Sequence, residues 1–455
     1  MMTIKDAKRA ASYHHNFWIV NLVNALFFSG YLILKFPLAF ILAHQGIALE
    51  QAYSLTTTAT IAFALCSLAL TGVMKSYHNQ KHALLLGIIL NLIAAFLLAT
   101  RQYHLEIIGL GCYVIGGSLY FFNITLLFNK QFIDPETRLH GNYFVQICLN
   151  IGAFIGSLVF LFAVSTGYHY FKYSISFMAV SLLLLTSCYW ILKDNPASLK
   201  QQLRLYGSCA VMFILILSSL QYPELTRWAV LFSFMLAALF GLYQARKYHE
   251  RGYFHFIILV LLFSLPYWIG NTILYNQFFV FLHDNVFSFF ALPATFIILL
   301  DPLGNVLFGI FWGQMTRNAS SRPYFNLQLG LILMTVAFGI LMLGLLLNID
   351  SAKISPLYPI ATLLLFASAQ FLIQPTMSSR VTDLIQNHDH MVFALGVLRS
   401  VRAFAAILAF YLIDLTVVPN HTEPMHQNMV LYAAIAVISV VAFAVFQCAK
   451  KKIIS

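Results

Sequence analysis

The chain has 455 residues, of which 60% are hydrophobic and 9% charged, and its formal net charge is +11. Soluble domains carry about a quarter charged residues, and so few charges cannot cover the surface of such an apolar chain in water. The composition therefore excludes a soluble enzyme, a nucleic-acid-binding protein and a disordered protein, and it indicates that lipid is the main solvent.

Apolar runs of spanning length follow one another along the chain, and two polar breaks divide them. A transmembrane helix takes roughly 20 residues, so six spans precede the first break, two lie between the breaks and six follow the second. We therefore predict an all-α integral membrane protein with about 14 spans. The runs lie near 16–43, 51–74, 83–100, 106–129, 142–165, 173–192, 207–222, 226–245, 253–282, 286–312, 325–347, 357–377, 391–413 and 429–447.

This layout predicts two six-helix bundles with an inserted pair of helices, which is the architecture of the major facilitator fold. The short run at 207–222 leaves open whether the first inserted helix crosses the membrane fully. The predicted parts are a cytoplasmic N-terminus at 1–15, a bundle at 16–192, the basic breaks with the inserted pair at 193–252, a second bundle at 253–448 and a basic cytoplasmic tail at 449–455.

Lysine and arginine are distributed unevenly among the loops. If the N-terminus is cytoplasmic, 19 of the 26 lie in cytoplasmic segments, 4 in outer loops and 3 inside spans. Cytoplasmic loops of membrane proteins carry such an excess, so the sequence predicts that both termini are cytoplasmic. The same bias explains the positive net charge without a nucleic-acid partner.

Three cations and one acid lie inside predicted spans: Lys35, Arg399, Arg402 and Asp301. The spacing of three places both arginines on one helix face. An uncompensated charge at membrane depth is costly, so the surplus of two positive charges predicts water or an anionic ligand. Two alternatives remain: Lys35 reaches the outer interface, and Asp301 forms a structural pair or gate with Arg402.

Polar side chains form stripes on several predicted spans. On the first span, Asn21, Asn24, Tyr31 and Lys35 fall within a sector of about 80°. A polar stripe on a spanning helix faces protein or water rather than lipid; helix-to-helix hydrogen bonding is the alternative. The candidate substrate-binding residues are Asn21, Asn24, Tyr31, Lys35, Asn123, Gln146, Asn150, Asn271, Asn276, Gln370, Arg399 and Arg402.

No Walker loop, dinucleotide fingerprint or zinc-spaced histidine pair occurs in the spans. These motifs would supply phosphate, nucleotide or metal binding. We therefore expect no cofactor, no metal site and no enzyme activity.

Four segments carry motifs of a known family. The fourth span ends in Asn123–Ile124, the fifth contains Asn150–Ile151–Gly152, and ILYNQFF and SAQFLIQPTMSSRVTDL lie in the second bundle. They resemble the fourth-, fifth-, seventh- and tenth-helix motifs of the proton-dependent oligopeptide transporter family, a branch of the major facilitator superfamily. The resemblance covers most of the chain and implies that fold. Bacterial members also insert two helices between the bundles.

The sequence departs from that family at its charged positions. An amide keeps the shape and hydrogen bonding of an acid but exchanges no proton near neutral pH. We therefore expect proton coupling by the family's usual route to be lost. The family's first-helix Glu-x-x-Glu-Arg is replaced by Asn21, Asn24 and Ala25, its fourth-helix lysine by Phe121, and its seventh- and tenth-helix acids by Asn276 and Gln370.

From this pattern we predict a secondary active transporter of the bacterial inner membrane that works by alternating access. Its expected partners are the lipid bilayer and a small anionic, carboxylate-bearing solute, such as a peptide-like compound or a citrate-type metal chelator (a siderophore). We expect a monomer. The alternative is a membrane receptor or sensor that kept the transporter fold and transports nothing.

Overall fold

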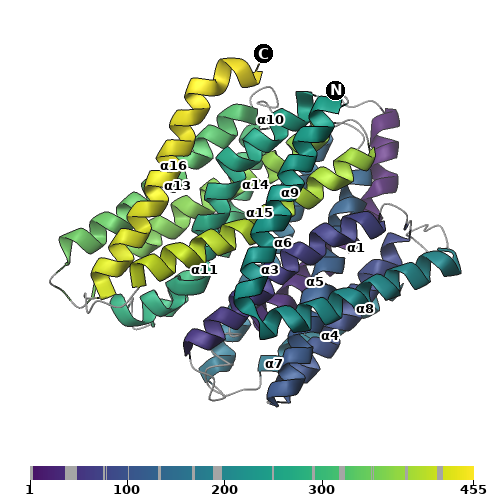
Figure 1. The fold of residues 1–455 in the computed structure, drawn as a ribbon, viewed down its shortest axis with the longest axis horizontal. Helices are drawn as coiled ribbons and strands as arrows, with labels where there is room; N and C mark the ends of the chain where they lie inside the picture. Colours follow the sequence, from purple (N-terminus) through teal and green to yellow (C-terminus); the bar gives the residue numbers. More distant parts are fainter. Residues whose placement is uncertain are drawn as a thin grey trace. The chain divides into compact units, whose positions relative to one another are not determined.

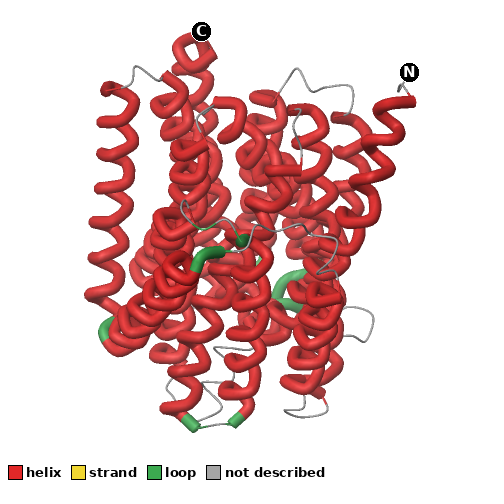
Figure 2. The backbone as a smooth tube through the Cα atoms, turned by 90° about the vertical axis from the view of Figure 1, so that its right-hand side faces the viewer, coloured by secondary structure: helices red, strands yellow, loops and turns green. Residues whose placement is uncertain are grey.

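The structure is a computed structural model of the chain. It describes residues 4–35, 49–74, 77, 79–100, 102–131, 135–165, 170–187, 197–247, 251–288, 293–316, 323–349, 351, 353–384, 388–417 and 424–454. Helices make up nearly all of this part (Figure 2). The extended pairing among these residues is a single bridge between Val286 and Ile354.

The chain divides into two compact units, unit 1 up to Thr226 and unit 2 from Arg227 onward. This division falls in the first turn of the second inserted helix, which begins at Pro223, and neither polar break marks it. The bundle boundaries expected from those breaks stay a prediction.

Unit 1 contains seven described helices (Figure 1). Small residues bring several of them close together, as between α1 and α6: a Cβ atom on Gly152 would lie 2.2 Å from the Ala25 carbonyl oxygen. The Ser29 hydroxyl on α1 also donates to the Gly152 carbonyl oxygen at 2.9 Å. The helices are α1 (Ile4–Lys35), α3 (Leu49–Met74), α4 (Gln80–Ala99), α5 (Tyr103–Gln131), α6 (Pro135–Ser165), α7 (Tyr170–Ser187) and α8 (Leu199–Gln221).

Unit 2 contains the remaining helices, two of them interrupted by other helix types. Counting α10, η2 and α11 as one segment and η3 with α12 as another, the described residues of the whole chain hold fourteen helical segments. They are α9 (Pro223–Lys247), α10 (Arg251–Leu259), the π-helix η2 (Val260–Ser264), α11 (Leu265–Asn285), the 3-10 helix η3 (Ala294–Leu299), α12 (Leu300–Thr316), α13 (Pro323–Leu347), α14 (Leu357–Leu384), α15 (His388–Val417) and α16 (Pro424–Ile454).

The first inserted helix, α8, packs against α3 and α5 of unit 1. Its Phe213 ring fills the space beside Gly111, where a Cβ atom would lie 2.7 Å from that ring. The Tyr206 hydroxyl lies 2.9 Å from Nε2 of His82 on α4. The helix has 23 residues, so it is longer than the apolar run at 207–222 and long enough to cross a bilayer.

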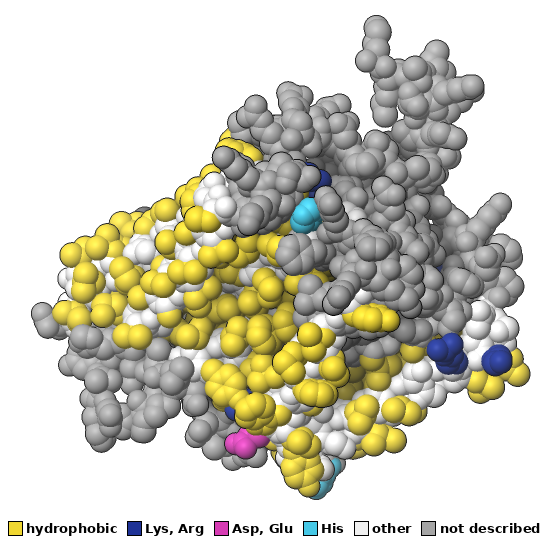
Figure 3. Space-filling view, turned by 45° about the horizontal axis from the view of Figure 1, so that its top comes forward, with side chains coloured by type: hydrophobic (Ala, Val, Ile, Leu, Met, Phe, Trp, Pro, Cys, Tyr) yellow, Lys and Arg dark blue, Asp and Glu magenta, His cyan; other side chains and the backbone are white. Residues whose placement is uncertain are grey.

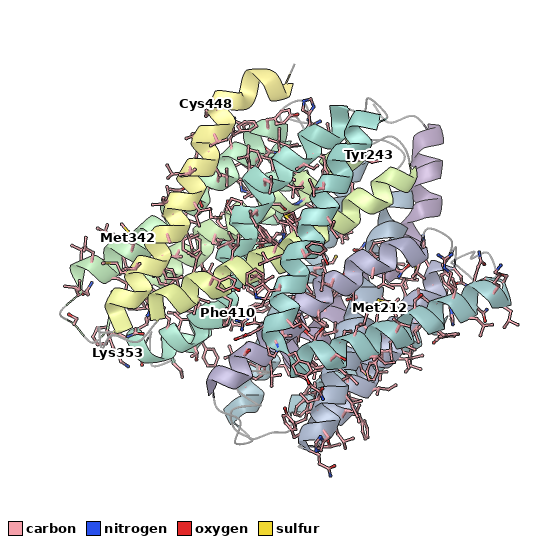
Figure 4. All side chains as sticks on the ribbon, in the orientation of Figure 1. Met212, Tyr243, Met342, Lys353, Phe410 and Cys448 are labelled. Carbon is pink, nitrogen blue, oxygen red and sulfur yellow. The ribbon has the colours of Figure 1, made fainter. Side chains whose placement is uncertain are left out.

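The second inserted helix, α9, contacts α15 within unit 2. The rings of Phe234 and Phe404 stack with their centroids 4.4 Å apart. The Arg227 guanidinium carbon lies 3.7 Å from the centroid of the Phe410 ring, which Figure 4 labels. Each inserted helix is therefore packed onto a different unit.

Within the described residues, nine helical segments are long and apolar enough to cross a membrane, and four shorter apolar helices accompany them. Large apolar side chains on them face outward, such as Phe96 and Leu215. On the face drawn in Figure 3, most described side chains are hydrophobic and charged ones are isolated. The chain is a multi-pass membrane protein, as predicted.

Some helix ends differ from the predicted runs. The first helix begins at Ile4 rather than near residue 16, so most of the expected N-terminal tail is helical. The run predicted at 286–312 begins with Val286 in an extended bridge, and the next described helix begins at Ala294. Hydropathy detects only the apolar part of a helix, so polar extensions are missed.

Candidate functional site

In unit 1, polar side chains of α1 and α5 form what we call the N-terminal polar cluster: Asn21, Asn24, Tyr120 and Asn123. All four are at most 1% exposed. The Tyr120 hydroxyl lies 3.4 Å from the Asn24 side-chain oxygen, to which it donates. One helical turn away, Phe27 stacks on the Tyr120 ring at a centroid distance of 3.7 Å. The structure thus joins the predicted α1 stripe to α5.

The amides of this cluster use only part of their hydrogen-bonding capacity. Asn123 donates to the Leu119 carbonyl of its own helix at 2.8 Å. Its side-chain oxygen and the Asn24 side-chain nitrogen are buried and have no hydrogen-bond partner among the described residues. The cluster can donate and accept hydrogen bonds, but its amides carry no charge and exchange no proton near neutral pH.

Aromatic rings surround this cluster where the resemblance placed a charged group. Tyr31 stacks on Tyr113 at a centroid distance of 4.6 Å and meets Phe121 edge-on at 5.1 Å. Phe121 also lies edge-on to Phe28 and Phe63. Edge-to-face ring pairs of this kind are favourable. The position of the family's fourth-helix lysine is therefore occupied by an aromatic packing residue.

The two predicted site residues on α6, Asn150 and Gln146, are joined by a hydrogen bond within that helix. Asn150 is 5% exposed, and its side-chain nitrogen donates to the Gln146 carbonyl oxygen at 2.8 Å. Gln146 is half-buried. Their assignment to a binding site stays a prediction.

In unit 2, seven side chains from α11, α12, α14 and α15 form what we call the C-terminal polar cluster. Tyr267 connects two amides of the cluster. Its hydroxyl oxygen accepts a hydrogen bond from Gln374 Nε2 at 2.7 Å and another from Asn271 Nδ2 at 3.2 Å. Both lone pairs of that oxygen are thereby used. The members are Tyr267, Asn271, Asp301, Asn305, Gln370, Gln374 and Arg402.

Asn305 links α12 to α14. Its side-chain nitrogen lies 2.9 Å from the Asp301 carbonyl oxygen, 3.2 Å from Asp301 Oδ1 and 3.3 Å from Gln370 Oε1. These three residues are at most 6% exposed. The network therefore holds a carboxylate and two amides together inside a bundle of spanning helices.

Arg402 brings the second charge to this cluster. It is half-buried, and its guanidinium carbon lies 4.7 Å from the centroid of the Trp268 ring, a cation–π arrangement. Trp268 directly follows Tyr267, and the centroids of these two rings are 5.1 Å apart, so the guanidinium lies next to the Tyr267 side of the cluster. The cluster therefore combines a cation, an anion and neutral hydrogen-bonding groups, which is suited to holding a small zwitterionic or anionic solute.

Two local breaks in regular helix position these residues. Pro266 has no N–H to donate, and the π-helix η2 lies directly before it, with Leu265 N–H donating to the Val260 carbonyl. Tyr267 and Trp268 follow at once. On the facing segment, the 3-10 helix η3 changes to α-helix at Leu300, directly before Asp301. Such irregular turns inside membrane helices recur at functional sites.

Some predicted site residues lie outside this description. The side chains of Lys35, Asn276 and Arg399 are not among the described ones. The sequence analysis did not predict Tyr267, Trp268, Asn305 or Gln374 as site residues. Tyr267 precedes Asn271, and Asn305 follows Asp301, by four positions, so the spacing that joins residues on one helix face was available as a signal.

Among the described residues, no group of three or more His, Cys, Asp or Glu side chains is placed to hold a metal ion.

No family model matches the sequence, and no curated protein matches it. Solved structures do match. One is a bacterial homologue of the human drug peptide transporters PepT1 and PepT2, with a TM-score of 0.77 and 16% identity over 96% of this chain and 99% of that chain. Another is a transporter of the proton-dependent oligopeptide transporter (POT) family in complex with 5-aminolevulinic acid, with a TM-score of 0.78 and 16% identity over 97% of both chains.

A third is the peptide transporter POT in complex with sulfate, with a TM-score of 0.74 and 15% identity over 96% of this chain and 94% of that chain. The chain therefore has the fold of the POT family transporters, a major facilitator fold. The fold class and the resemblance carried by Asn123–Ile124 and Asn150–Ile151–Gly152 are confirmed at this level.

Proposed function

We propose that the protein is a secondary active transporter of a small carboxylate-bearing solute, working by alternating access in the bacterial inner membrane with both termini cytoplasmic. The observation that carries the proposal is Arg402, a half-buried arginine on α15 that lies over the Trp268 ring and belongs to the C-terminal polar cluster. A guanidinium can bind a carboxylate through two parallel hydrogen bonds.

The ligands named for two structural relatives support an anionic solute. One relative was solved with 5-aminolevulinic acid and another with sulfate. The first ligand carries a carboxylate and the second is an inorganic anion. A peptide-like acid or a citrate-type metal chelator is the class of solute that we propose for this chain.

A second function, a receptor or sensor that moves no solute, is favoured by one specific observation. Four positions that resemble acids of the family are amides here, namely Asn21, Asn24, Asn276 and Gln370. A protein that lost coupling while keeping its binding groups would bind the solute without accumulating it.

A binding screen followed by a transport assay tests both functions. The purified protein is screened by thermal shift against 5-aminolevulinate, citrate, ferric citrate, Ala-Ala and Ala-Asp, because a ligand stabilises by its affinity for the folded state. We expect a carboxylate-rich compound to raise the melting temperature. Counterflow of the labelled hit into proteoliposomes then separates the two functions: entry of label indicates a transporter, and binding without entry indicates a receptor.

The chain offers a matched control for this screen. Arg402 and Arg227 both stack on an aromatic ring within unit 2. The proposal predicts that Arg402→Gln loses the ligand-induced shift and that Arg227→Gln keeps it. Equal shifts in the two variants would contradict an anion site at Arg402.

A further inference from the structure

Asp301 is the acid that lies deepest in a described span. The candidate span Ala294–Trp312 has 19 residues, and Asp301 is the eighth of them and 3% exposed. Across the nine described candidate spans, the other acid is Glu106, which lies near the start of its helix. A carboxyl group at membrane depth is costly to keep charged and is typical of proton relays in transporters.

Hydrogen-bond acceptors outnumber the N–H donors around the Asn305 side chain. The Asn305 amide has two N–H hydrogens, but three acceptors lie within 3.3 Å of its nitrogen: two oxygens of Asp301 and one of Gln370. The amide alone therefore cannot serve all three with full hydrogen bonds. A proton on the Asp301 carboxyl would add the missing donor.

The oxygen of the same amide points to the same conclusion. Asn305 is 0% exposed, and its Oδ1 has no hydrogen-bond partner among the described residues. A buried acceptor without a donor is destabilising. If Asp301 is protonated, the amide can turn over and accept from the carboxyl O–H, so Asn305 can serve both protonation states of Asp301.

We propose that Asp301 binds the coupling proton in this protein, in place of the first-helix acids that Asn21 and Asn24 replace. The proposal rests on the proposed transport function. The step is an acid–base transfer without an oxidant or leaving group. One proton from water bonds to an Asp301 carboxylate oxygen, the charge of that group changes from −1 to 0, and the reverse step releases the proton.

Arg402 provides the link to the solute. Arg402 lies over Trp268, whose neighbour Tyr267 accepts from Gln374, and Gln374 is one helical turn from the Gln370 that shares the Asn305 amide with Asp301. A carboxylate bound to Arg402 therefore adds negative charge to the cluster that contains Asp301. This favours the protonated form of Asp301. Besides Asp301, the titratable or charged members of the C-terminal polar cluster are Tyr267 from α11 and Arg402 from α15. The helix η3 has no titratable residue, and α14 contributes the neutral Gln370, which shares the Asn305 amide with Asp301. Anion binding and proton uptake are therefore thermodynamically linked.

The first experiment needs no solute. Infrared difference spectra of the full chain in proteoliposomes, recorded across a pH titration, report the C=O stretching band of a protonated carboxylic acid. We expect a titrating band in the parent that is absent in Asp301→Asn and shifted in Asp301→Glu. Glu106→Gln is the matched control, since it removes the other buried acid that the structure describes, and it should keep the band.

A band that persists in Asp301→Asn, or one that vanishes in Glu106→Gln instead, overturns the proposal. If Asp301→Asn does not fold, Asp301→Glu decides, because an unshifted band then belongs to another group. This arm stands whether or not the protein transports anything, so its failure is separate from failure of the proposed function.

The second experiment measures the linkage with citrate as the probe. Titration calorimetry in buffers of different ionisation enthalpy gives the number of protons taken up per citrate bound. We expect close to one more proton in the parent than in Asp301→Asn, and citrate affinity in the parent that falls up to about tenfold per pH unit where Asp301 loses its proton. Equal proton uptake in the two proteins overturns the linkage.

Discussion

The two polar clusters are built from similar side chains but differ in charge. The N-terminal polar cluster of unit 1 holds amides and a tyrosine, and its neighbours are packed aromatic rings such as Phe27 and Phe121. The C-terminal polar cluster of unit 2 holds amides and a tyrosine together with Asp301 and Arg402. Charge-dependent chemistry can therefore be supplied by the C-terminal polar cluster, while the N-terminal polar cluster supplies shape and neutral hydrogen bonds.

The largest expected effect tests the charged member of this comparison. Replacing Arg402 with glutamine should weaken binding of a carboxylate ligand by about 2 to 4 kcal/mol, because a desolvated charge pair is lost. Arg402→Lys keeps the charge but not the two-pronged geometry, so it should weaken binding less. Isothermal titration with the hit from the thermal-shift screen measures both. A glutamine variant that binds as tightly as the parent would end the anion-site hypothesis.

A substitution at Asp301 distinguishes two roles for Arg402: binding a ligand, or forming a structural ion pair with Asp301. If Arg402 serves a ligand, Asp301→Asn should remain foldable and keep or raise its affinity for anions. If Arg402 mainly balances Asp301, the same variant should melt at a clearly lower temperature and show no change in ligand preference. Melting temperature and anion affinity, measured side by side with the arginine variants, distinguish the two outcomes.

A second comparison tests whether Tyr267, the tyrosine of the C-terminal polar cluster, stabilises the protein through its hydrogen bonds or through burial of its ring. Tyr267 and Tyr432 are both 0% exposed in unit 2, but the Tyr267 hydroxyl accepts two amide hydrogen bonds and the Tyr432 hydroxyl has no partner among the described residues. Tyr267→Phe should cost about 1 to 3 kcal/mol, because two buried N–H groups lose their acceptor.

Tyr432→Phe removes a hydroxyl that makes no such bond, so it should be close to neutral. Thermal melting of the two variants in the same detergent provides the measurement. Similar losses in both would mean that ring packing, and not the amide network, is what the phenylalanine substitution disturbs.

The corresponding test in unit 1 concerns packing. A Cβ atom on Gly152 would lie 2.2 Å from the Ala25 carbonyl oxygen, whereas one on Gly207 would meet nothing within 4 Å. Gly152→Ala should therefore separate α1 from α6 and cost about 1 to 3 kcal/mol. Gly207→Ala should be neutral or slightly stabilising, since alanine favours helix over glycine. Equal melting temperatures for Gly152→Ala and Gly207→Ala would show that α1 and α6 are farther apart at Gly152 than the structure indicates.

The sequence predicted the fold well because spanning helices leave a strong signal. Apolar runs of about 20 residues fix the number and order of helices, and the motif around Asn150–Ile151–Gly152 lies where α6 approaches α1 most closely. The site was predicted only in part. Asp301 and Arg402 are conspicuous as charges in apolar runs, but Tyr267 and Asn305 have ordinary spacing and gain their importance from contacts with other helices, which no single-helix pattern encodes.

The smallest expected effect is the one that distinguishes the two clusters most directly. Asn24→Glu places an acid at a family acid position, so a protein that lacked only this group should regain proton-driven uptake of a dipeptide. We expect no gain. Asn24 is 0% exposed, and a carboxyl group there would be held neutral by burial unless a cation stabilised its charge. The positions of the family cations are Ala25 and Phe121, and Phe121 packs edge-on against Phe27, Tyr31 and Tyr120.

Uptake of labelled Ala-Ala into proteoliposomes with an imposed pH gradient measures the effect, with Asn24→Gln as the matched neutral control. Clear accumulation by the glutamate variant alone would show that the N-terminal polar cluster still contains the coupling route and that one residue silences it.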